Sequence, residues 1–315
     1  EKGKYIDYAD IQSLYPTVQY YDQLPCGIPK WDEDVEYSKS YLENHFGYYE
    51  VDIVCPKNIH IPLLPEKKDM KLNFDLVDKN KAVYTSVELL RAVEIGYEIK
   101  KIYKVLYFDR SDDLFKGYVR NFLKIKAECS GYDGDDIDEY IQRYYDACGV
   151  LLDKEKIKAN KGKKLLAKIL LNSLWGKFGQ KDNMPTTEYI TDPSKWFRML
   201  RDNNEGKITL QNETLLDENT MYIQYVSNET AKSSLNTTNV ALAGFTTSQA
   251  RLRLYQELYK LDKRVIYCDT DSIVYEHDDS KYNIPISDVL GGWELETKKN
   301  VHITEFVGFA PKSYA

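Results

Sequence analysis

Residues 264–276 read R-V-I-Y-C-D-T-D-S-I-V-Y-E, and the interpretation of the whole chain starts from this stretch. Two β-favouring runs, V-I-Y at 265–267 and I-V-Y at 273–275, flank a short acidic turn. The pattern predicts two strands whose connecting turn presents the carboxylates of Asp269 and Asp271 at the end of a sheet. Asp and Ser are also common in ordinary turns, so this stretch alone leaves a metal site and a plain turn open.

Length and composition describe a globular chain of 315 residues, 43% of them apolar, without a run of about 20 apolar residues that could span a bilayer. The five cysteines form no C-x-x-C pair, which favours a reducing compartment and argues against structural zinc. The chain has no initiating Met and starts inside an expected strand, so we interpret it as the interior of a larger protein.

Charge gives a mixed signal about nucleic acid. The net charge of −7 argues against such a partner, because affinity for phosphates comes from Lys and Arg. Residues 154–168 nevertheless contain seven lysines, whereas residues 133–139 contain five acids and no base. We interpret the acidic run as a solvated surface.

The N-terminal third predicts a strand, a short helix and then a section of different texture. Residues 4–9 alternate as a strand that leads into Asp10, and residues 18–23 favour a helix. The L-P-C-G-I-P stretch at 24–29 is expected to break regular structure. After it we expect a small α+β core with a helix capped by Thr85 and Glu88. Its expected strands are 47–55, 61–64, a hairpin over 73–85, and 97–108.

The remainder predicts long helices followed by strands. Helical spacing of apolar residues is found at 111–129, 135–148, 162–178 and 237–260. Between the last two we expect a short helix near Trp196 and a hairpin formed by residues 206–211 and 221–226. The expected C-terminal strands are 291–298, 301–307 and 313–314.

The helix at 162–178 carries a polar stripe through an otherwise apolar surface. The stripe consists of Lys164, Lys168, Asn172, Trp175 and Gly179, spaced 4, 4, 3 and 4 along one face. An ordinary amphipathic surface helix would explain the lysines. It does not explain the asparagine and the glycine, which indicate a face that another molecule approaches closely.

Strand-end carboxylates at Asp10, Asp269 and Asp271 would repel each other in one sheet unless divalent cations lie between them. Mg²⁺ prefers carboxylate and phosphate oxygens, and two such ions are the usual device for displacement at phosphorus. The lysines of the stripe would hold a triphosphate. The pattern therefore predicts a nucleotidyltransferase.

Four motifs in order resemble those of family B DNA polymerases, and specifically the protein-primed subfamily of phages and linear plasmids. They are D-I-Q-S-L-Y-P at 10–16, K-I-L-L-N-S-L-W-G at 168–176, Y-C-D-T-D-S at 267–272 and K-S-Y at 312–314. The resemblance implies an α+β fold with an antiparallel palm sheet, helical fingers and two subfamily insertions. Palm, insertion, fingers, insertion and palm would be residues 1–21, 22–113, 114–180, 181–230 and 231–315. An exonuclease and a thumb would lie outside this chain.

The resemblance also assigns roles at the catalytic centre. Asp10, Asp269 and Asp271 would be the catalytic carboxylates, with Asp10, Asp271 and the Ile11 carbonyl binding two Mg²⁺ ions, or Mn²⁺ in their place. Tyr15 would exclude the 2′-hydroxyl of a ribonucleotide. The triphosphate would be held by Lys126 and Lys168, and the nucleotide would further contact Asn172 and Trp175.

Contacts with DNA are implied for Lys164 at the template, Gly176 near the nascent base pair, Thr270, and Lys312 with Tyr314 at the primer end. Trp175 departs from the family, which usually has Tyr there, so the contacts of a tyrosine hydroxyl are not expected at this position.

The implied function is template-directed DNA synthesis, in which deoxynucleotides are added to a primer 3′-hydroxyl or to the hydroxyl of a terminal priming protein. DNA template, primer, dNTPs and that protein are the expected partners, with no membrane. The expected location is the cytoplasm of an infected or plasmid-bearing cell, or an organelle. Two alternatives remain: a DNA-binding module without catalysis, which the retained carboxylates disfavour, and a reverse transcriptase or RNA polymerase, which the S-L-Y-P motif disfavours.

Overall fold

The computed structural model describes residues 4–69, 71–134, 136–181, 184–228, 237–298 and 301–315. Two compact units are present. The first consists of Glu1–Trp175 and Ala241–Ala315, and the second is Gly176–Val240. None of the helices in the described residues is long and apolar enough to cross a membrane.

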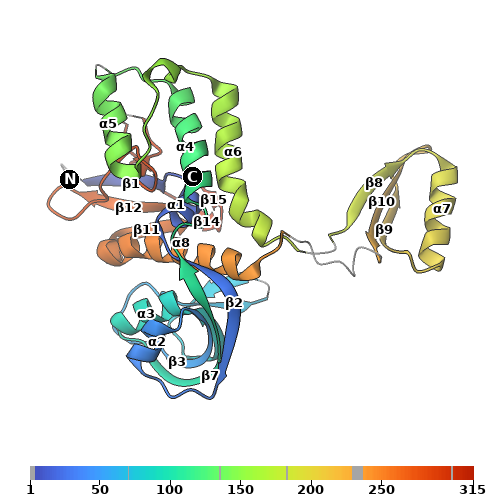
Figure 1. Cartoon of the computed structure of the whole chain (residues 1–315), viewed down its shortest axis with the longest axis horizontal. Coiled ribbons are helices and arrows are strands. Elements are labelled where there is room, and N and C mark those ends of the chain that lie inside the picture. Colours follow the sequence, from blue (N-terminus) through green and yellow to red (C-terminus); the bar gives the residue numbers. More distant parts are fainter. Residues whose placement is uncertain (1–3, 70, 135, 182–183, 229–236, 299–300) are drawn as a thin grey trace. The chain divides into compact units, whose positions relative to one another are not determined.

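The first unit contains a four-stranded sheet in the order β11-β12-β1-β13, at the place where the resemblance predicts the palm. Its strands β1, β12 and β11 lie side by side in Figure 1. Its strands come from both ends of the sequence: β1 (Lys4–Ile11), β11 (Val265–Asp269), β12 (Ser272–Asp278) and β13 (Trp293–Leu295). β1 pairs antiparallel with both β12 and β13. This arrangement confirms the hairpin predicted from residues 264–276, and it brings the start of the chain beside that hairpin.

Two helices of the palm connect the sheet to the rest of the unit. α1 (Leu14–Tyr21) follows β1 directly, and all but two of its eight residues are buried. α8 (Val240–Leu261) buries Phe245, Leu254 and Leu258 among others. Arg253 of α8 forms a bidentate ion pair with Asp22 at 2.5 and 3.0 Å, which ties the end of α1 to α8.

The segment that follows α1 forms its own small α+β core. Its sheet has the order β2-β7-β3-β6, built from β2 (Leu24–Glu33), β3 (Gly47–Val54), β6 (Lys79–Thr85) and β7 (Glu98–Ser111). α2 (Lys39–Asn44) and α3 (Ser86–Glu94) pack on it over Tyr49, Val51 and Val105. The predicted capping box of Thr85 and Glu88 is confirmed at the start of α3.

Three expectations for this segment are wrong. The L-P-C-G-I-P stretch does not break the chain, because β2 runs through it with a register shift between Cys26 and Lys30, where Gly27 has φ 74°. The strand expected at 61–64 is absent, and β4 (Pro65–Lys68) follows it instead. β5 (Lys71–Phe74) pairs with β4 and not with β6, so the hairpin expected over 73–85 does not form.

Where the resemblance predicts the fingers, three helices pack around one core: α4 (Lys116–Ser130), α5 (Ile137–Cys148) and α6 (Lys161–Phe178), with the turn η1 (Lys154–Lys156) between α5 and α6. Val119 and Leu123 of α4 meet Tyr140 of α5 and Leu171 of α6 in this core. Tyr20 of α1 also belongs to it, so the fingers are joined to the palm by buried side chains.

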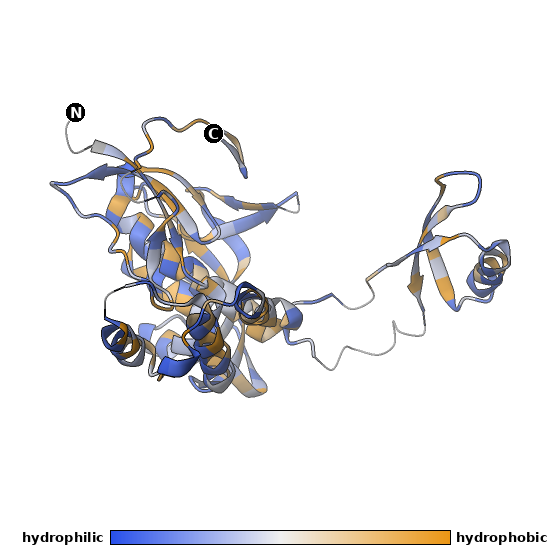
Figure 2. Cartoon of the chain, turned by 90° about the horizontal axis from the view of Figure 1, so that it is seen from above, coloured by the Kyte–Doolittle hydropathy of each residue, from blue (hydrophilic) through white to orange (hydrophobic). Residues whose placement is uncertain are grey.

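The second unit is a three-stranded sheet in the order β8-β10-β9 with one helix. Its elements are β8 (Thr186–Ile190), α7 (Pro193–Asn204), β9 (Ile208–Leu215) and β10 (Met221–Ser227). Hydrophobic and hydrophilic residues both occur on this unit (Figure 2), and the buried residues Ile190, Met199 and Ile223 form its core. The sequence predicted the β9–β10 hairpin and α7 but not β8.

The C-terminal strands are shorter than expected. Within the described residues, 291–298 contain only the three residues of β13, and 301–307 contain a single bridge from Ile303 to Ile6. β14 (Gly308–Ala310) and β15 (Ser313–Tyr314) form a separate hairpin. β13 is short because it pairs only with Ala9, Asp10 and Ile11, the last three residues of β1.

Candidate active site

Asp10 and Asp271 meet at one end of the palm sheet. Asp10 lies opposite Ser272 in the register of β1 and β12, and the amide of Ile11 donates a 2.8 Å hydrogen bond to the carbonyl oxygen of Asp271. The sequence prediction that these two residues approach each other across 261 positions (271 − 10) is thereby confirmed.

The turn that carries Asp271 is tight and held by its own side chains. Asp269 pairs with Ser272, which leaves Thr270 and Asp271 as the two-residue loop. Thr270 adopts φ 50°, and the amide of Asp271 donates to the carbonyl of Asp269 at 2.6 Å. The Ser272 hydroxyl donates to the same carbonyl at 3.1 Å. These bonds fix the direction in which both carboxylates leave the backbone.

Carboxylates crowd this edge, and their pKa values record it. Burial, together with the negative charges of Asp271, Glu296 and Glu294, raises the pKa of Asp10 to about 7. Lys168 acts on Asp10 in the opposite direction. Burial also raises the pKa of Asp271, to which the charge of Asp269 contributes. The site therefore holds more negative charge than its described cations neutralise.

Glu294 and Glu296 belong to this cluster, and the sequence analysis missed both. Glu294 pairs with Asp10 in the β1–β13 register, and the amide of Glu296 donates to the carbonyl of Tyr8 at 2.9 Å. Oxygens from Asp10, Glu294 and Glu296 lie within 4.8 Å of one another. The alternation in W-E-L-E at 293–296 was the available signal, because it puts both glutamates on one face of a strand.

Asp269 behaves differently from its two neighbours because a lysine contacts it. Lys312 Nζ donates to both carboxylate oxygens of Asp269, at 2.9 and 2.7 Å. Burial alone would raise the pKa of Asp269, but the hydrogen bonds from Lys312 and Thr270 outweigh it and lower the pKa. Lys312, predicted at the primer end, thus lies directly beside the carboxylate turn.

Tyr314 lies in the β14–β15 hairpin against the palm. Its hydroxyl is 2.9 Å from the hydroxyl of Tyr8, and its ring is 5.2 Å from that of Tyr267 between centroids. The amide of Lys312 donates to the Tyr267 hydroxyl at 2.9 Å. The K-S-Y motif is therefore anchored on β1 and β11, the strands that also carry Asp10 and Asp269.

The fingers contribute two lysines to the same site. Lys126 of α4 is largely buried and donates from Nζ to the Ser13 hydroxyl at 3.1 Å. Burial lowers its pKa, and the positive charge of Lys168 on α6 lowers it further. Lys168 itself is exposed and is close enough to oppose the pKa increase of Asp10. Lys164, one turn earlier on α6, is also exposed.

Tyr15 and Trp175 form an aromatic pair between α1 and α6. Their ring centroids are 4.1 Å apart with the planes inclined by 32°, and both side chains are half-buried. One turn before Trp175, the Oδ1 atom of Asn172 is buried and has no hydrogen-bond partner in the described residues. A buried acceptor without a partner is unfavourable, which marks Asn172 as a residue that a ligand would satisfy.

Gly176, which the sequence analysis assigned to the DNA contacts, lies on the same helix α6 and is the first residue of the second unit.

The donors at this edge fit a divalent cation of the magnesium type. All the charged donors around Asp10 are carboxylates, and oxygen ligands are those that Mg²⁺ and Mn²⁺ prefer. The raised pKa of Asp10 gives a second reason, because a bound cation would favour the ionised carboxylate that its neighbours disfavour. The residues present therefore fit the metal predicted from the sequence.

Comparison with known proteins places these features in a family. The family described as "DNA polymerase type B, organellar and viral" matches residues 1–141 and 133–285. A probable DNA polymerase of Neurospora intermedia is 26% identical over 99% of this chain, which covers 29% of that protein. The DNA polymerase of Streptococcus phage Cp-1 is 26% identical over 87% of this chain and 40% of its own.

Solved structures give the same fold. Phi29 DNA polymerase in an orthorhombic crystal form superposes with a TM-score of 0.56 at 19% identity, covering 93% of this chain and 43% of that one. Its ternary complex with primer-template DNA and incoming nucleotide substrates gives a TM-score of 0.54 with the same coverage. The chain thus spans less than half of each of these relatives. The predicted fold, an antiparallel palm sheet with helical fingers, is confirmed, and the chain belongs to the organellar and viral type B DNA polymerases.

Proposed function

We propose that this chain is the palm and fingers of a template-directed DNA polymerase that transfers deoxynucleotides to a primer 3′-hydroxyl. The observation that carries the proposal is the meeting of Asp10 and Asp271 at one sheet end, with Lys168 of the fingers close enough to affect Asp10. In this reaction the primer 3′-oxygen forms a bond to the α-phosphorus of the nucleotide, and pyrophosphate leaves.

Two Mg²⁺ ions would be held by Asp10, Asp271 and the carbonyl of Ile11, with Asp269 as the third catalytic carboxylate. Bound there, such ions stabilise the negative charge that develops on the phosphoryl oxygens. Mn²⁺ would fit the same oxygen donors. The crowding of carboxylates around Asp10 supports this assignment, since the charges of Asp271, Glu296 and Glu294 raise its pKa against the effect of Lys168.

The fingers would bind the nucleotide. Lys168 and Lys126 are placed to hold the triphosphate, and the partnerless Oδ1 of Asn172 supports a polar contact with the substrate. Trp175 would pack near the nascent base pair, and Tyr15 beneath it would limit the space at the sugar 2′ position. Burial lowers the pKa of Lys126, and phosphate oxygens bound beside it would act in the opposite direction by favouring the charged lysine.

DNA would be held on the two sides of this site. Lys312, Tyr314 and Thr270 are proposed to contact the primer end, because all three lie at or beside the carboxylate turn. Lys164 is proposed to face the template, and Gly176 to lie near the nascent base pair. The segments 22–113 and 181–230 are proposed as the subfamily insertions, the former with a priming protein as its partner.

The test is primer extension by the full-length protein on a template of defined sequence, with Mg²⁺ and the four dNTPs. Asp10→Asn and Asp271→Asn should each lower kcat by at least about 10²-fold, the loss typical of removing one charge-stabilising group. Asp262→Asn, at an exposed position just before β11, is the matched control and should retain activity. Extension with equal rates in all three variants would exclude catalysis at this site.

Protein priming needs a separate measurement. The full-length enzyme, a candidate terminal protein and radiolabelled dATP should give a labelled protein band that resists denaturation. If a DNA primer is extended but no protein is labelled with any candidate encoded beside the polymerase, the proposal of DNA synthesis stands and that of protein priming fails.

A further inference from the structure

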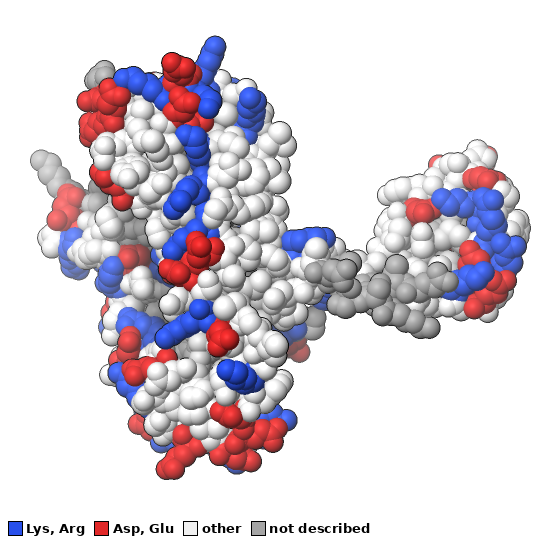
Figure 3. Space-filling model, in the orientation of Figure 1, with Lys and Arg blue, Asp and Glu red and all other residues white. Residues whose placement is uncertain are grey.

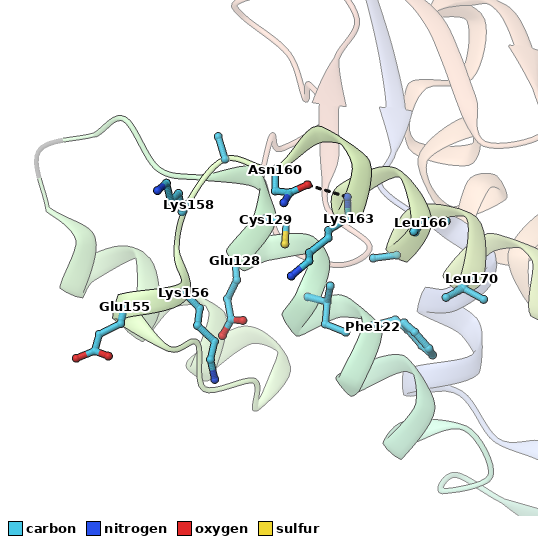
Figure 4. A pocket seen from close by; sticks show the side chains of 13 residues that line it. Phe122, Glu128, Cys129, Glu155, Lys156, Lys158, Asn160, Lys163, Leu166 and Leu170 are labelled. Carbon is cyan, nitrogen blue, oxygen red and sulfur yellow. Dashed lines mark hydrogen bonds between the residues drawn. The ribbon is translucent and has the colours of Figure 1, made fainter.

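A pocket of about 730 Å³ lies in the fingers, between α4, α6 and the connecting segment 155–160 (Figure 4). Phe122 and Ile125 of α4 and Leu166 and Leu170 of α6 supply its apolar wall. Its volume falls in the range of sites that bind a small molecule or anchor a side chain of a partner.

The pocket is part of the fold and not a gap in a loose loop. The amide of Lys158 donates to the Glu128 carbonyl at 3.0 Å, and that of Asn160 donates to the Cys129 carbonyl at 2.9 Å. The Asn160 side chain accepts from the amide of Lys163 at 3.0 Å (Figure 4). These bonds hold the connecting segment against the end of α4, so the cavity is formed before any ligand arrives.

The proposed polymerase reaction does not use this side of α6. Leu166 and Leu170 follow Lys164 and Lys168 of the polar stripe by two positions each. Two positions correspond to a rotation of about 200° around a helix, so the leucines lie on the side opposite the stripe. Both leucines are more exposed than a core residue, at 61% and 40%. Figure 3 shows an uncharged surface over α6 with basic side chains at its upper end. An apolar surface of this kind on a helix indicates a contact with another molecule.

The described lining of the pocket contains more basic than acidic side chains: Lys156, Lys158 and Lys163 against Glu128 and Glu155. Lys158 and Lys163 line it, and neither forms an ion pair with any residue that the structure describes. Glu128 is already engaged, since it pairs with Lys124 at 2.8 Å and accepts from the amide of Asp153 at 2.8 Å. Lys156 pairs with Asp153 at 2.8 Å, and Glu155 is exposed. The lining therefore carries a net positive charge, from Lys158 and Lys163 against Glu155, beside an apolar wall.

We propose that this pocket is a docking site for an acidic protein segment that inserts an apolar side chain between α4 and α6. An aliphatic or aromatic anchor fits the apolar wall, and flanking Asp or Glu residues complement Lys158 and Lys163. Single-stranded nucleic acid fits less well, because its bases bind by stacking on aromatic or Arg side chains. Among the described residues that line the pocket, Phe122 is the one aromatic residue and none is Arg.

The test is selection of random 12-residue peptides displayed on phage against the full-length protein, followed by fluorescence anisotropy with the enriched peptides. The expected peptides are acidic around one large apolar residue. Leu166→Ser should weaken them by at least about tenfold, the effect of losing a central anchor contact. Lys163→Glu should weaken them several-fold, and less at high salt.

Matched controls exist on the same helix. Leu165→Ser changes an equally exposed leucine, 57% accessible, that does not line the pocket, and Lys161→Glu changes an exposed lysine outside the lining. Both should leave peptide affinity unchanged, and circular dichroism of all four variants checks that they fold.

Three outcomes would overturn the proposal. One is that no peptide is enriched, and another is that the enriched peptides bind Leu166→Ser and Leu165→Ser equally well. The third is that a labelled dT₁₂ oligonucleotide binds with the same sensitivity to Leu166→Ser and Lys163→Glu, since this would assign the pocket to nucleic acid.

Discussion

The backbone amide of Ile11 donates a 2.8 Å hydrogen bond to the carbonyl oxygen of Asp271, so the end of β1 and the acidic turn after β11 form one structural unit. A main-chain bond of this kind fixes how far apart the two backbones lie, and the carboxylates of Asp10 and Asp271 leave from these adjacent backbones. Because like charges so placed disfavour each other's ionisation, the geometry proposed for catalysis should reduce the stability of the metal-free fold.

The first prediction concerns pH and Asp10 in protein freed of metal with EDTA. The pKa of Asp10 is about 7 in the fold and close to 4 in an unfolded chain, so between these values the folded state binds more protons. Stability therefore falls as pH rises from about 4 to 7. Asp10→Asn removes this contribution, so the Tm difference between variant and wild type should shift in favour of the variant over that range. A difference independent of pH would contradict the raised pKa.

Metal addition gives the second prediction. Mg²⁺ binds the folded site and not the unfolded chain, so it should raise the Tm of the wild-type protein. At a Mg²⁺ concentration of ten times the Kd, the free energy of unfolding should increase by about 1.4 kcal/mol. The same addition should have little effect on Asp10→Asn or Asp271→Asn. Differential scanning fluorimetry with Mg²⁺ and with K⁺ at equal ionic strength is the measurement. Equal Mg²⁺ stabilisation in all three proteins would place the ion elsewhere.

A third prediction tests Lys168, which is exposed on α6 and opposes the pKa increase of Asp10. Lys168→Ala should raise the KM for dNTP and lower kcat, since a charge that binds the triphosphate also acts in the transition state. Lys161→Ala, an exposed lysine two turns earlier, should change neither constant. Steady-state kinetics that are unaltered by Lys168→Ala would make this lysine an ordinary solvated side chain.

The sequence predicts those parts of the fold that depend on residues close to one another in the chain. Helices with a repeating apolar face were found within a few residues, as for α6, predicted at 162–178 and observed at Lys161–Phe178. The hairpin of β11 and β12 was also found, because its strands are adjacent in sequence. Pairing between distant strands was not, and β5 was assigned to β6 although it pairs with β4.

The site shows the same division. Asp10, Asp269 and Asp271 were identified by motif, whereas Glu294 and Glu296 reach the site only because β13 pairs with β1. No pattern of neighbouring residues predicts that β13 pairs with β1. The continuation of β2 through Pro25 and Gly27 was missed for a related reason, since a bulge on an edge strand tolerates both residues.

The fourth prediction concerns the joint between α8 and the β-rich segment after α1. Glu88 is 3% exposed, caps α3 through Thr85, and accepts a 2.6 Å hydrogen bond from Arg251 of α8. Arg251→Met should destabilise the protein by up to about 3 kcal/mol, because it leaves a buried carboxylate without its guanidinium partner. Combining it with Glu88→Gln should restore part of the loss in chemical denaturation. The explanation would be contradicted if the double variant lost more stability than the two single variants lose in total.

The last prediction is that Tyr15 selects the sugar. Its ring lies 4.1 Å from that of Trp175 and is half-buried, so packing is one of its roles. The ring also lies beside the carboxylate edge, since Tyr15 follows the end of β1 by four residues and the charge of Asp271 contributes to its raised pKa, after burial. Replacing it with Val opens space where a 2′-hydroxyl would lie, whereas Tyr15→Phe keeps the ring and removes only the hydroxyl.

Exclusion by crowding should therefore be lost in Tyr15→Val and kept in Tyr15→Phe. A pocket that only crowds a hydroxyl discriminates by something like 10²-fold, which sets the scale of the change in the ratio of kcat/KM for dCTP and CTP. Primer extension with each nucleotide measures that ratio in the wild type and both variants. If Tyr15→Val still extends primers with the wild-type ratio, Tyr15 only packs against Trp175. If Tyr15→Phe relaxes the ratio as much as Tyr15→Val does, a hydrogen bond of the hydroxyl is responsible instead of the volume of the ring.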